Sequence, residues 1–239
     1  MSLNISDIKL LSNDLSTLPS SKLIINTLNA HSFNIAQSNS SFKQALTFGD
    51  VLLPDGISIV WAKRFLDGTK LIKIAGADLF LWEMQRLNTN NGSCFFLGSS
   101  EETLAAIKDR IAQEYPNVKV QTYSPPYKQE FTESENKEML NVINTFQPDV
   151  IFVGMTAPKQ EIWAYRHKNQ INATHICCIG AVFDFYAGTV KRAPNWMIKM
   201  GLEWLFRLLK EPRRLWKRYL IGNIRFVYFI IKEKWFCKP

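Results

Sequence analysis

Between residues 179 and 220, the chain passes from a predicted buried strand into a basic segment that is rich in aromatic residues. The apolar run HICCIG ends at Gly180, and such a run is typical of a strand buried on both faces of a parallel sheet. Asp184 comes soon after that end. In an open α/β sheet, the loops at the carboxyl ends of the strands form the ligand crevice. Asp184 is therefore a candidate substrate-binding carboxylate, although the capping of a turn would explain the same position.

The positive charge of the chain is concentrated near its C-terminal end. Residues 189–239 contain thirteen Lys or Arg and three Glu, a net charge of +10, whereas the whole chain carries +8. Residues 1–188 are therefore slightly acidic. Aromatic residues are interleaved with the tail's charges, a combination that suits an interfacial helix on an anionic bilayer. Two other interpretations stay open: a C-terminal helix packed on the core with a solvated basic face, or a nucleic-acid-binding segment.

The length and composition of the chain predict one sizeable core with a C-terminal addition. With 239 residues, of which 46% are hydrophobic, the chain can bury one core without needing a second domain. We expect an α/β core over residues 1–195 and a basic, aromatic-rich helical appendage over residues 196–239. No apolar run reaches the roughly 18 residues of a membrane-spanning helix. The first residues also lack the pattern of a secretory signal, so the sequence predicts a cytoplasmic location.

Neither the cysteines nor the histidines form a recognisable metal site or catalytic motif. Cys94, Cys177, Cys178 and Cys237 lack metal-binding spacing, and we expect reduced thiols, with the adjacent pair on opposite faces of a strand. Of the three histidines, His31 is a weak candidate for a base because it follows a predicted strand exit. The chain contains no HExxH or DxD motif. The sequence therefore predicts no metal and no other cofactor.

Predicted strands and helices alternate along most of the chain. A strand over residues 22–28 precedes a weak helical pattern over residues 30–46, and VLL leads through Pro-Asp-Gly into the helical pattern ISIVWAKRFL. The stretch LIKIAGADLFLWEMQRL is interpreted as a second strand and helix pair, and further pairs follow from residue 93 to residue 179. Such alternation predicts right-handed crossovers and a Rossmann-like parallel sheet with helices on both faces.

Three loops at predicted strand exits carry polar residues. Asp55 lies in a Pro-Asp-Gly sequence, whose local chemistry alone favours a turn residue. The stretch FFLGSSEE could bind an anion at a helix N-terminus, although a plain N-cap is the simpler interpretation. In VGMTAPKQE, Thr156 is a predicted N-cap and Pro158 fits the first helical turn, so residues 159–161 would face the mouth of the sheet. A capped surface helix would have the same pattern.

Several motifs, taken in order, resemble the WecG/TagA/CpsF glycosyltransferase family, also called glycosyltransferase family 26: VLLPDGISIVWAKRF, KIAGADLF, FFLGSS, PDVIFVGMTAPKQEIW, IGAVFDFYAGTVKRAPNWM and GLEWLFRLLKEPRRLWKRYL. The resemblance runs from about residue 27 to residue 219, and the combination of motifs is far more specific than any one of them. It implies a GT-E-like fold and an inverting transfer of a sugar, typically of the N-acetylmannosamine type, from a UDP-sugar to a polyprenyl-diphosphate-linked acceptor. It also implies bacterial surface polysaccharide or teichoic-acid biosynthesis at the inner face of the cell membrane.

The resemblance also implies roles for individual residues. Asp55 would be the catalytic base that takes a proton from the acceptor hydroxyl. Arg207 and Arg214, with Lys217 or Arg218, would stabilise the leaving diphosphate, because guanidinium groups match the geometry of phosphate oxygens. The remaining substrate-binding residues would be Thr27, Asn29, Lys73, Gln160 and Asp184, of which Asp184 would contact the nucleotide.

Two positions depart from the family pattern, since Lys73 stands where the family often has Arg and Thr156 replaces a frequent Gly. The expected partners are a UDP-sugar donor, a polyprenyl-diphosphate-linked sugar acceptor and the cytoplasmic membrane surface, with no nucleic acid; the sequence leaves open whether the protein forms a homo-oligomer. The alternative function is a non-catalytic peripheral module that binds anionic lipid or nucleic acid through its basic tail. A nicotinamide-dependent dehydrogenase is disfavoured because no strand is followed by the glycine fingerprint.

Overall fold

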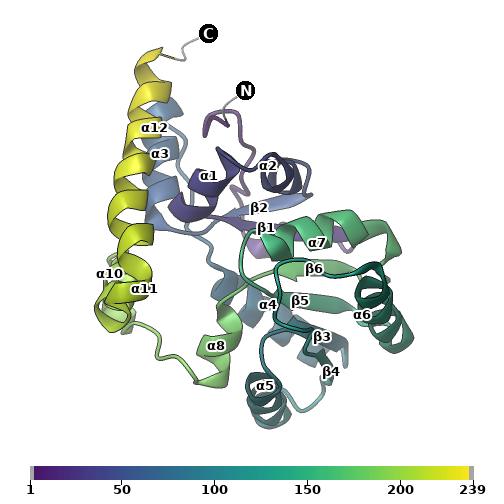
Figure 1. Cartoon of the computed structure of the whole chain (residues 1–239). Helices are drawn as coiled ribbons and strands as arrows, with labels where there is room; N and C mark the ends of the chain where they lie inside the picture. The colour runs from purple at the N-terminus through teal and green to yellow at the C-terminus, as the bar shows by residue number, and fades with distance from the viewer. Residues whose placement is uncertain (1–2, 237–239) are drawn as a thin grey trace.

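The computed structural model describes residues 3–236, apart from the side chain of Lys199, and its centre is a six-stranded sheet (Figure 1). The strands follow the order β2-β1-β6-β5-β3-β4, and every neighbouring pair is parallel. Their bounds are β1 (Leu23–Leu28), β2 (Val51–Pro54), β3 (Ser93–Gly98), β4 (Lys119–Tyr123), β5 (Val150–Gly154) and β6 (His175–Cys178). This arrangement confirms the predicted Rossmann-like α/β fold.

Apart from the polar edge strand β4, the strands are short and mostly apolar runs in the middle of the molecule. Strands β3, β5 and β6 are almost entirely buried, as expected for strands that are covered on both faces. Consecutive side chains point to opposite faces, so Cys177 belongs to one apolar cluster and Cys178 to another. Both are buried free thiols, as is Cys94, which confirms the prediction for these three cysteines. Cys237 lies outside the described residues.

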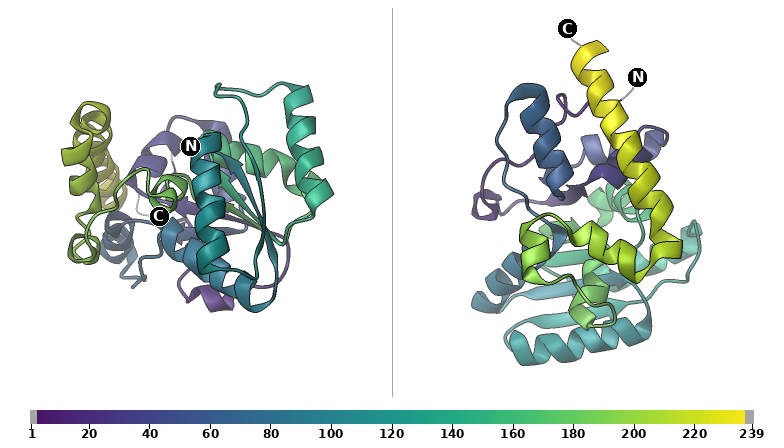
Figure 2. Two further views of the ribbon diagram at one scale, coloured as in Figure 1. Left: turned by 90° about the horizontal axis from the view of Figure 1, so that it is seen from below. Right: turned by 90° about the vertical axis from the view of Figure 1, so that its left-hand side faces the viewer.

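Helices cover both faces of the sheet (Figures 1 and 2). One face packs against α4 (Gly76–Thr89), α5 (Glu101–Glu114) and α8 (Val182–Ala187). The other packs against α6 (Glu133–Phe146) and α7 (Lys159–His167). Each of these helices turns an apolar stripe toward the strands, so the alternation in the sequence reproduces the layers of the fold. Short 3-10 turns lie at Leu15–Thr17 and Lys168–Gln170.

A third apolar cluster joins the two ends of the described chain. It lies between the N-terminal segment and four helices, α1 (Ala30–Ala36), α2 (Ser40–Thr47), α3 (Ile57–Asp67) and α12 (Gly222–Phe236). The Phe33 and Phe226 rings meet edge to face with their centroids 5.4 Å apart. The Glu233 carboxylate accepts hydrogen bonds from the backbone N–H groups of Ile5 and Ser6, at 2.8 and 2.7 Å. The C-terminal appendage therefore contacts the core along α12 (Figure 1).

The basic segment before α12 forms short helices instead of one continuous helix. After α9 (Asn195–Lys199) and α10 (Glu203–Lys210), Pro212 occupies the first turn of α11 (Pro212–Trp216). A π-helical turn over Lys217–Ile221 then leads into α12. Because Pro212 has no N–H to donate, a helix can begin at this residue but is interrupted by it. None of the helices in the described part of the chain is long and apolar enough to cross a membrane.

One expectation about local structure is wrong, and another needs refinement. Residues 71–75, which include the expected strand, form an extended connection in which Ile74 N donates to Pro54 O at 3.1 Å, but no strand ladder forms. The helical pattern over residues 30–46 is two helices, because Asn39 has extended backbone angles and its side chain caps α2. Apolar periodicity alone therefore shows neither whether a strand has a pairing partner nor where a capping residue begins a new helix.

Candidate active site

The carboxyl ends of all six strands open into one large pocket, whose volume is about 2360 Å³. Each strand exit contributes to the lining, with Asn29 after β1, Asp55 after β2, Ser99 after β3, Ser124 after β4, Thr156 after β5 and Gly180 after β6. The segment from α10 to α12 supplies a further part of the wall. This is the position of the ligand crevice in an open α/β sheet.

Asp55 lies at the end of β2 and is partly exposed to the pocket. Its backbone N–H donates to the Leu28 carbonyl oxygen at 2.9 Å, which ties this turn to the end of β1. Burial raises the pKa of Asp55 to about 6, and the negative charge of Glu203 adds to the increase. A hydrogen bond from Asn29 and the positive charge of Lys73 oppose it. Above pH 6 the carboxylate is mostly ionised and can accept a proton in the pocket.

Asn29 both caps α1 and contacts Asp55. Its Oδ1 accepts hydrogen bonds from the backbone N–H groups of His31 and Ser32, at 3.0 and 3.1 Å, and its side chain also hydrogen bonds to Asp55. Burial and the positive charge of Arg218 lower the pKa of His31 to about 4, so this imidazole is neutral at pH 7. Because the group with the lower pKa is the weaker base, Asp55 is a better proton acceptor than His31.

Gln160 and Glu161 form a buried polar pair at the start of α7. The two residues are only 4% and 2% exposed, and Gln160 Nε2 donates to Glu161 Oε1 at 2.8 Å. Burial raises the pKa of Glu161 to about 7. Among the described residues, Gln160 Oε1 and Glu161 Oε2 have no hydrogen-bond partner. Unpaired buried oxygens are uncommon, so this pair is a candidate for hydrogen bonding to a substrate.

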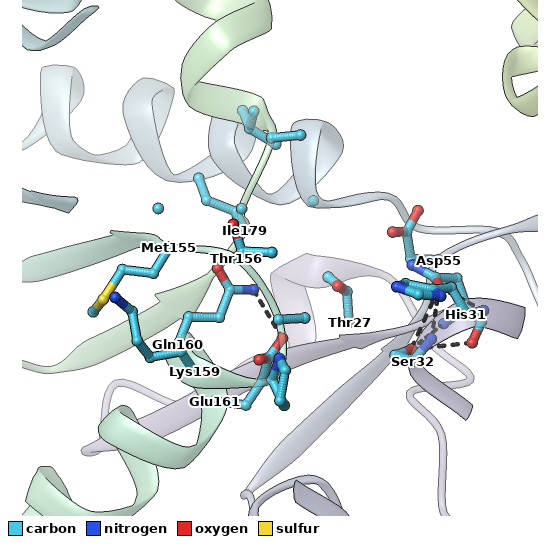
Figure 3. A pocket seen from close by; sticks show the side chains of 18 of the residues that line it. Thr27, His31, Ser32, Asp55, Met155, Thr156, Lys159, Gln160, Glu161 and Ile179 are labelled. Carbon is cyan, nitrogen blue, oxygen red and sulfur yellow. Dashed lines mark hydrogen bonds between the residues drawn. The ribbon is translucent and has the colours of Figure 1, made fainter. Parts of the chain in front are cut away.

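Figure 3 shows how the sheet brings these polar groups to one volume. Thr27, near the end of β1, lies between the Gln160 and Glu161 pair on one side and Asp55 and His31 on the other. Strand β1 occupies the position between β2 and β6, which explains its central place in this view. Residues that are distant in the sequence therefore face a single pocket.

Thr156 does not cap α7, contrary to the sequence-based expectation. The N-cap position belongs to Pro158. A Thr156 side-chain cap would bind the backbone N–H group of Lys159. This N–H group instead donates to the Thr156 carbonyl oxygen at 3.0 Å. The simpler interpretation of FFLGSSEE is confirmed, because the Ser100 hydroxyl accepts a hydrogen bond from Thr103 N at the start of α5.

Asp184 lies in the first turn of α8 and lines the pocket. Burial raises the pKa of its carboxyl group, while the positive charges of Arg207 and Arg214 oppose this increase. The Asp184 backbone oxygen accepts hydrogen bonds from Thr189 Oγ1 and Val190 N, at 3.1 and 3.2 Å. The turn after α8 is therefore closed by the backbone of Asp184, and its carboxylate faces the arginines of the C-terminal segment.

Three arginines of the C-terminal segment line the same pocket. The Arg207 guanidinium lies over the Phe185 ring, 5.3 Å from its centroid. The Nε atoms of Arg207 and Arg218 are buried and have no hydrogen-bond partner within the described residues. Arg214 is exposed, and its Nε donates to Glu211 Oε2 at 2.5 Å. Unpaired guanidinium N–H groups beside a polar pocket are suited to an anion such as a diphosphate.

The structure does not bring every expected residue to the pocket. Lys73 lines it, and the charge of this side chain lowers the pKa of Asp55. Lys217 is exposed outside the lining, with its ammonium group 5.6 Å from the centroid of the Trp216 ring. Lys217 and Arg218 are adjacent in a helical turn, so their side chains leave the backbone in different directions. Only Arg218 of this pair contributes to the pocket.

Sequence reasoning did not identify the contributions of Glu161 and Glu203. Glu161 accepts the hydrogen bond that orients the Gln160 amide. Glu203 pairs with Arg192 at 3.5 Å and raises the pKa of Asp55. Both glutamates lie in motifs that carry the family resemblance, but their burial and partners depend on tertiary contacts. Among the residues that the structure describes, no group of three or more His, Cys, Asp or Glu side chains could hold a metal ion.

A parallel sheet whose strand exits surround a carboxylate, beside several arginines, forms a pocket that is suited to a phosphate-bearing substrate. The chain belongs to the glycosyl transferase WecG/TagA/CpsF family, whose model matches residues 7–238, and it is a glycosyltransferase.

The chain is also similar to two relatives whose names are more specific. One relative is the N-acetylglucosaminyldiphosphoundecaprenol N-acetyl-beta-D-mannosaminyltransferase of Bacillus subtilis (strain 168), to which the chain is 30% identical over 211 residues. The alignment covers 88% of this chain and 80% of the relative. The protein of the same name from Staphylococcus aureus (strain MW2) is 31% identical over 216 residues, with coverage of 89% and 81%.

Proposed function

We propose that this glycosyltransferase transfers N-acetylmannosamine or a related sugar, with inversion, from a UDP-sugar to N-acetylglucosamine linked to polyprenyl diphosphate. The names of the two relatives describe this sugar and this acceptor, and the similarity extends over most of both chains. The observation that carries the proposal is Asp55, a pocket carboxylate whose pKa is raised to about 6. A carboxylate of this kind suits a base that removes a proton from a sugar hydroxyl near neutral pH.

In the proposed reaction, the acceptor hydroxyl oxygen attacks the anomeric carbon of the donor sugar. The bond between that carbon and the UDP oxygen breaks at the same time, and the bonding electron pair leaves with the diphosphate. Asp55 receives the proton of the attacking hydroxyl. Since the carbon is attacked from the side opposite to the leaving group, its configuration inverts.

The arginines are proposed to stabilise the charge that develops on the leaving diphosphate. Arg207 and Arg218 have buried Nε groups without partners in the described chain, and the charge of Arg214 acts on Asp184 in the same part of the pocket. Preorganised cations are most effective in a site from which water is excluded. Because guanidinium groups can neutralise a diphosphate by themselves, we propose that the transfer is independent of metal ions and other cofactors.

The remaining polar residues are proposed to orient the two substrates. Asp184 can accept hydrogen bonds from the hydroxyl groups or the N–H group of the uridine. Thr27, Asn29 and Gln160 line the pocket and offer hydroxyl and amide groups to the two sugars. Lys73 lines the same region and can bind an oxygen of the donor.

An acceptor carried on a polyprenyl chain remains in a membrane, so the enzyme must work at the bilayer surface. The net charge of +10 in residues 189–239 and the exposed side chains of Trp196 and Trp216 suit an anionic leaflet. We therefore propose a peripheral location on the cytoplasmic face of the cell membrane. The corresponding role is the synthesis of bacterial surface polysaccharide or of a teichoic-acid linkage unit.

The alternative function, a non-catalytic module that binds anionic lipid, accounts for the basic tail but not for the pocket-lining arginines or the raised pKa of Asp55. The two functions are separated by incubating the protein with several UDP-sugars and an acceptor of N-acetylglucosamine linked to a short-chain polyprenyl diphosphate. We expect acceptor-dependent release of UDP, with UDP-N-acetylmannosamine or a close analogue as the best donor. Failure of every donor to release UDP, with retained binding to anionic vesicles, would favour the module.

A further inference from the structure

The pocket has a second, apolar arm that the transfer chemistry does not use. This arm lies between α3 and α12, which run alongside each other (Figures 1 and 2), and we call it the α3–α12 groove. Its walls are the side chains of Trp61 and Phe65 from α3, and of Val227 and Ile231 from α12. They are large apolar side chains with exposed fractions of 63%, 48%, 52% and 44%. Below them, Phe226 and Ile230 are buried in the core and form an apolar floor.

The two walls are regular features of the helices and not isolated exposed residues. Trp61 and Phe65 are four residues apart, as are Val227 and Ile231, so each pair lies on one face of its helix. The far end of the groove is fixed by Lys234, whose ammonium group donates to the carbonyl oxygens of Phe65 and Leu66 at 3.0 and 2.9 Å. The spacing of the helices is therefore held by hydrogen bonds at the C-terminal end of α3.

The near end of the groove is polar and opens into the proposed catalytic site. Asn223, one turn before Val227, lines the pocket together with Arg218. Arg218 carries one of the two buried Nε atoms that lack a partner in the described chain, and its charge acts on both His31 and Asp55. The cavity as a whole thus has a cationic end beside the base and a hydrocarbon-like arm leading away from it.

Such a two-part cavity complements an amphiphile that carries a diphosphate at one end and a hydrocarbon chain at the other. Trp61 and Phe65 are four residues apart, so this wall extends along about 6 Å of the helix axis, because a helix rises about 1.5 Å per residue. Contiguous exposed apolar surface of this kind is uncommon on a soluble protein unless it binds something. The charge of Arg218 and the continuity of the two arms favour one ligand that spans both.

We propose that the α3–α12 groove binds the isoprenoid units next to the diphosphate of the lipid-linked acceptor. The identity of this acceptor rests on the proposed function, whereas the groove is defined by its lining residues alone. The diphosphate of the acceptor lies at the polar end of the groove, beside Asn223 and near the positive charge of Arg218, and the first part of the chain lies between Trp61 and Ile231. The rest of the chain continues past Trp235 toward the bilayer. The enzyme therefore distinguishes lipid-linked acceptors from the same sugar on a short carrier by direct contact with the chain.

A binding experiment without any sugar donor tests the groove independently of catalysis. Farnesyl diphosphate and dimethylallyl diphosphate share a head group and differ in chain length, and their affinities are measured by calorimetry below the micelle concentration. Because burial of each additional isoprenoid carbon is favourable, the wild-type protein should prefer the farnesyl compound by at least about tenfold. Trp61→Ala and Ile231→Ala should each remove most of this preference while leaving the affinity for the short compound unchanged.

The matched control is Ile224→Ala, because Ile224 lies on the same helix and is 72% exposed but does not line the pocket. It should keep the full farnesyl preference. Equal affinities of the wild-type protein for the two diphosphates would overturn the proposal, as would an equal loss in the Ile224→Ala variant. A second experiment measures the binding of each variant to phosphatidylglycerol vesicles and its oligomeric state. If Trp61→Ala weakens either property without changing the farnesyl preference, the groove is a membrane or dimer surface and the proposal is wrong.

Turnover is a third measurement, and it depends on the proposed transfer reaction. With N-acetylglucosamine on farnesyl diphosphate and on dimethylallyl diphosphate as acceptors, Trp61→Ala should raise KM about tenfold for the longer acceptor alone, with kcat preserved. If the wild-type protein transfers sugar to neither acceptor but still prefers to bind farnesyl diphosphate, the proposed function is refuted and the assignment of the groove stands. A uniform loss of kcat on both acceptors in Trp61→Ala would contradict a chain-binding role.

Discussion

Asn29 connects a helix cap to the candidate base, because its Oδ1 caps the first turn of α1 while its side chain also hydrogen bonds to Asp55. The two residues follow neighbouring parallel strands, β1 and β2, whose carboxyl ends lie at one edge of the sheet. The hydrogen bond favours the ionised form of Asp55 and lowers its pKa against the effect of burial. The geometry of the base therefore depends on the start of the neighbouring helix.

Asn29→Asp separates these two roles. The new carboxylate can still accept the capping hydrogen bonds, whereas it cannot donate to Asp55 and adds a negative charge beside it. We expect the acid limb of the kcat/KM profile to move to higher pH by roughly one unit or more. Asn29→Ala should in addition lose about 1 kcal/mol of unfolding free energy through the missing cap. Profiles of both variants that coincide with the wild type would show that Asn29 does not act on the base.

The pH dependence of transfer should report the pKa of Asp55. Since the base must be ionised, kcat/KM should decrease as the pH falls through about 6, the raised value for this carboxyl group. Glu203 contributes to the increase through its negative charge, so Glu203→Gln should shift the acid limb to lower pH. The control is Glu102→Gln, an exposed residue in the first turn of α5. A limb that is unchanged in Glu203→Gln would assign the ionisation to another group.

The arginines of the C-terminal segment should affect catalysis even when the acceptor is water-soluble. Arg207→Ala and Arg218→Ala each remove a pocket-lining guanidinium group, and we expect kcat to decrease by roughly 10²- to 10³-fold. The matched control is Arg213→Ala, an exposed arginine of α11 that does not line the pocket. It should retain nearly full activity on the soluble acceptor and lose only some binding to anionic vesicles. Similar small losses in all three variants would reduce the segment to a membrane anchor.

Chelation tests whether these cations are sufficient for the leaving diphosphate. If Arg207, Arg214 and Arg218 neutralise its charge, an excess of EDTA should leave the initial rate of UDP release within about twofold of the untreated value. The measurement is repeated after addition of Mg²⁺ or Mn²⁺. An enzyme that is inactivated by EDTA and reactivated by either ion would require a metal-bound diphosphate and a different assignment of the charge stabilisation.

The sheet could be predicted from the sequence because its strands are short, apolar and separated by regular helical patterns. The expected strand near residues 71–75 does not form, although these residues are also mostly apolar. Apolar character alone does not supply a neighbouring strand to pair with. The residue type of Thr156 favours a cap of α7, but the Lys159 N–H group that its side chain would bind donates to the Thr156 carbonyl oxygen.

The site is less predictable than the fold because its properties arise from tertiary contacts. Local chemistry alone makes Asp55 a turn residue, and only its burial and the negative charge of Glu203 raise its pKa to that of a base. Glu161 belongs to a recognisable motif, yet nothing in the sequence shows that its carboxyl group is buried against Gln160. Lys217 and Arg218 are equivalent candidates by composition, and the helical turn decides that only Arg218 lines the pocket.

The most direct test of the account is the turnover of Asp55→Asn, measured beside its affinity for UDP and its stability. The amide keeps the shape of the side chain and removes its basicity, so we predict a decrease in kcat of roughly 10²- to 10⁴-fold. UDP affinity should be unchanged, and the variant should be at least as stable as the wild type at pH 7, because the partly buried carboxylate with its raised pKa disfavours the folded state there. Transfer at a near wild-type rate by this folded, UDP-binding variant would contradict the assignment of Asp55 as the catalytic base.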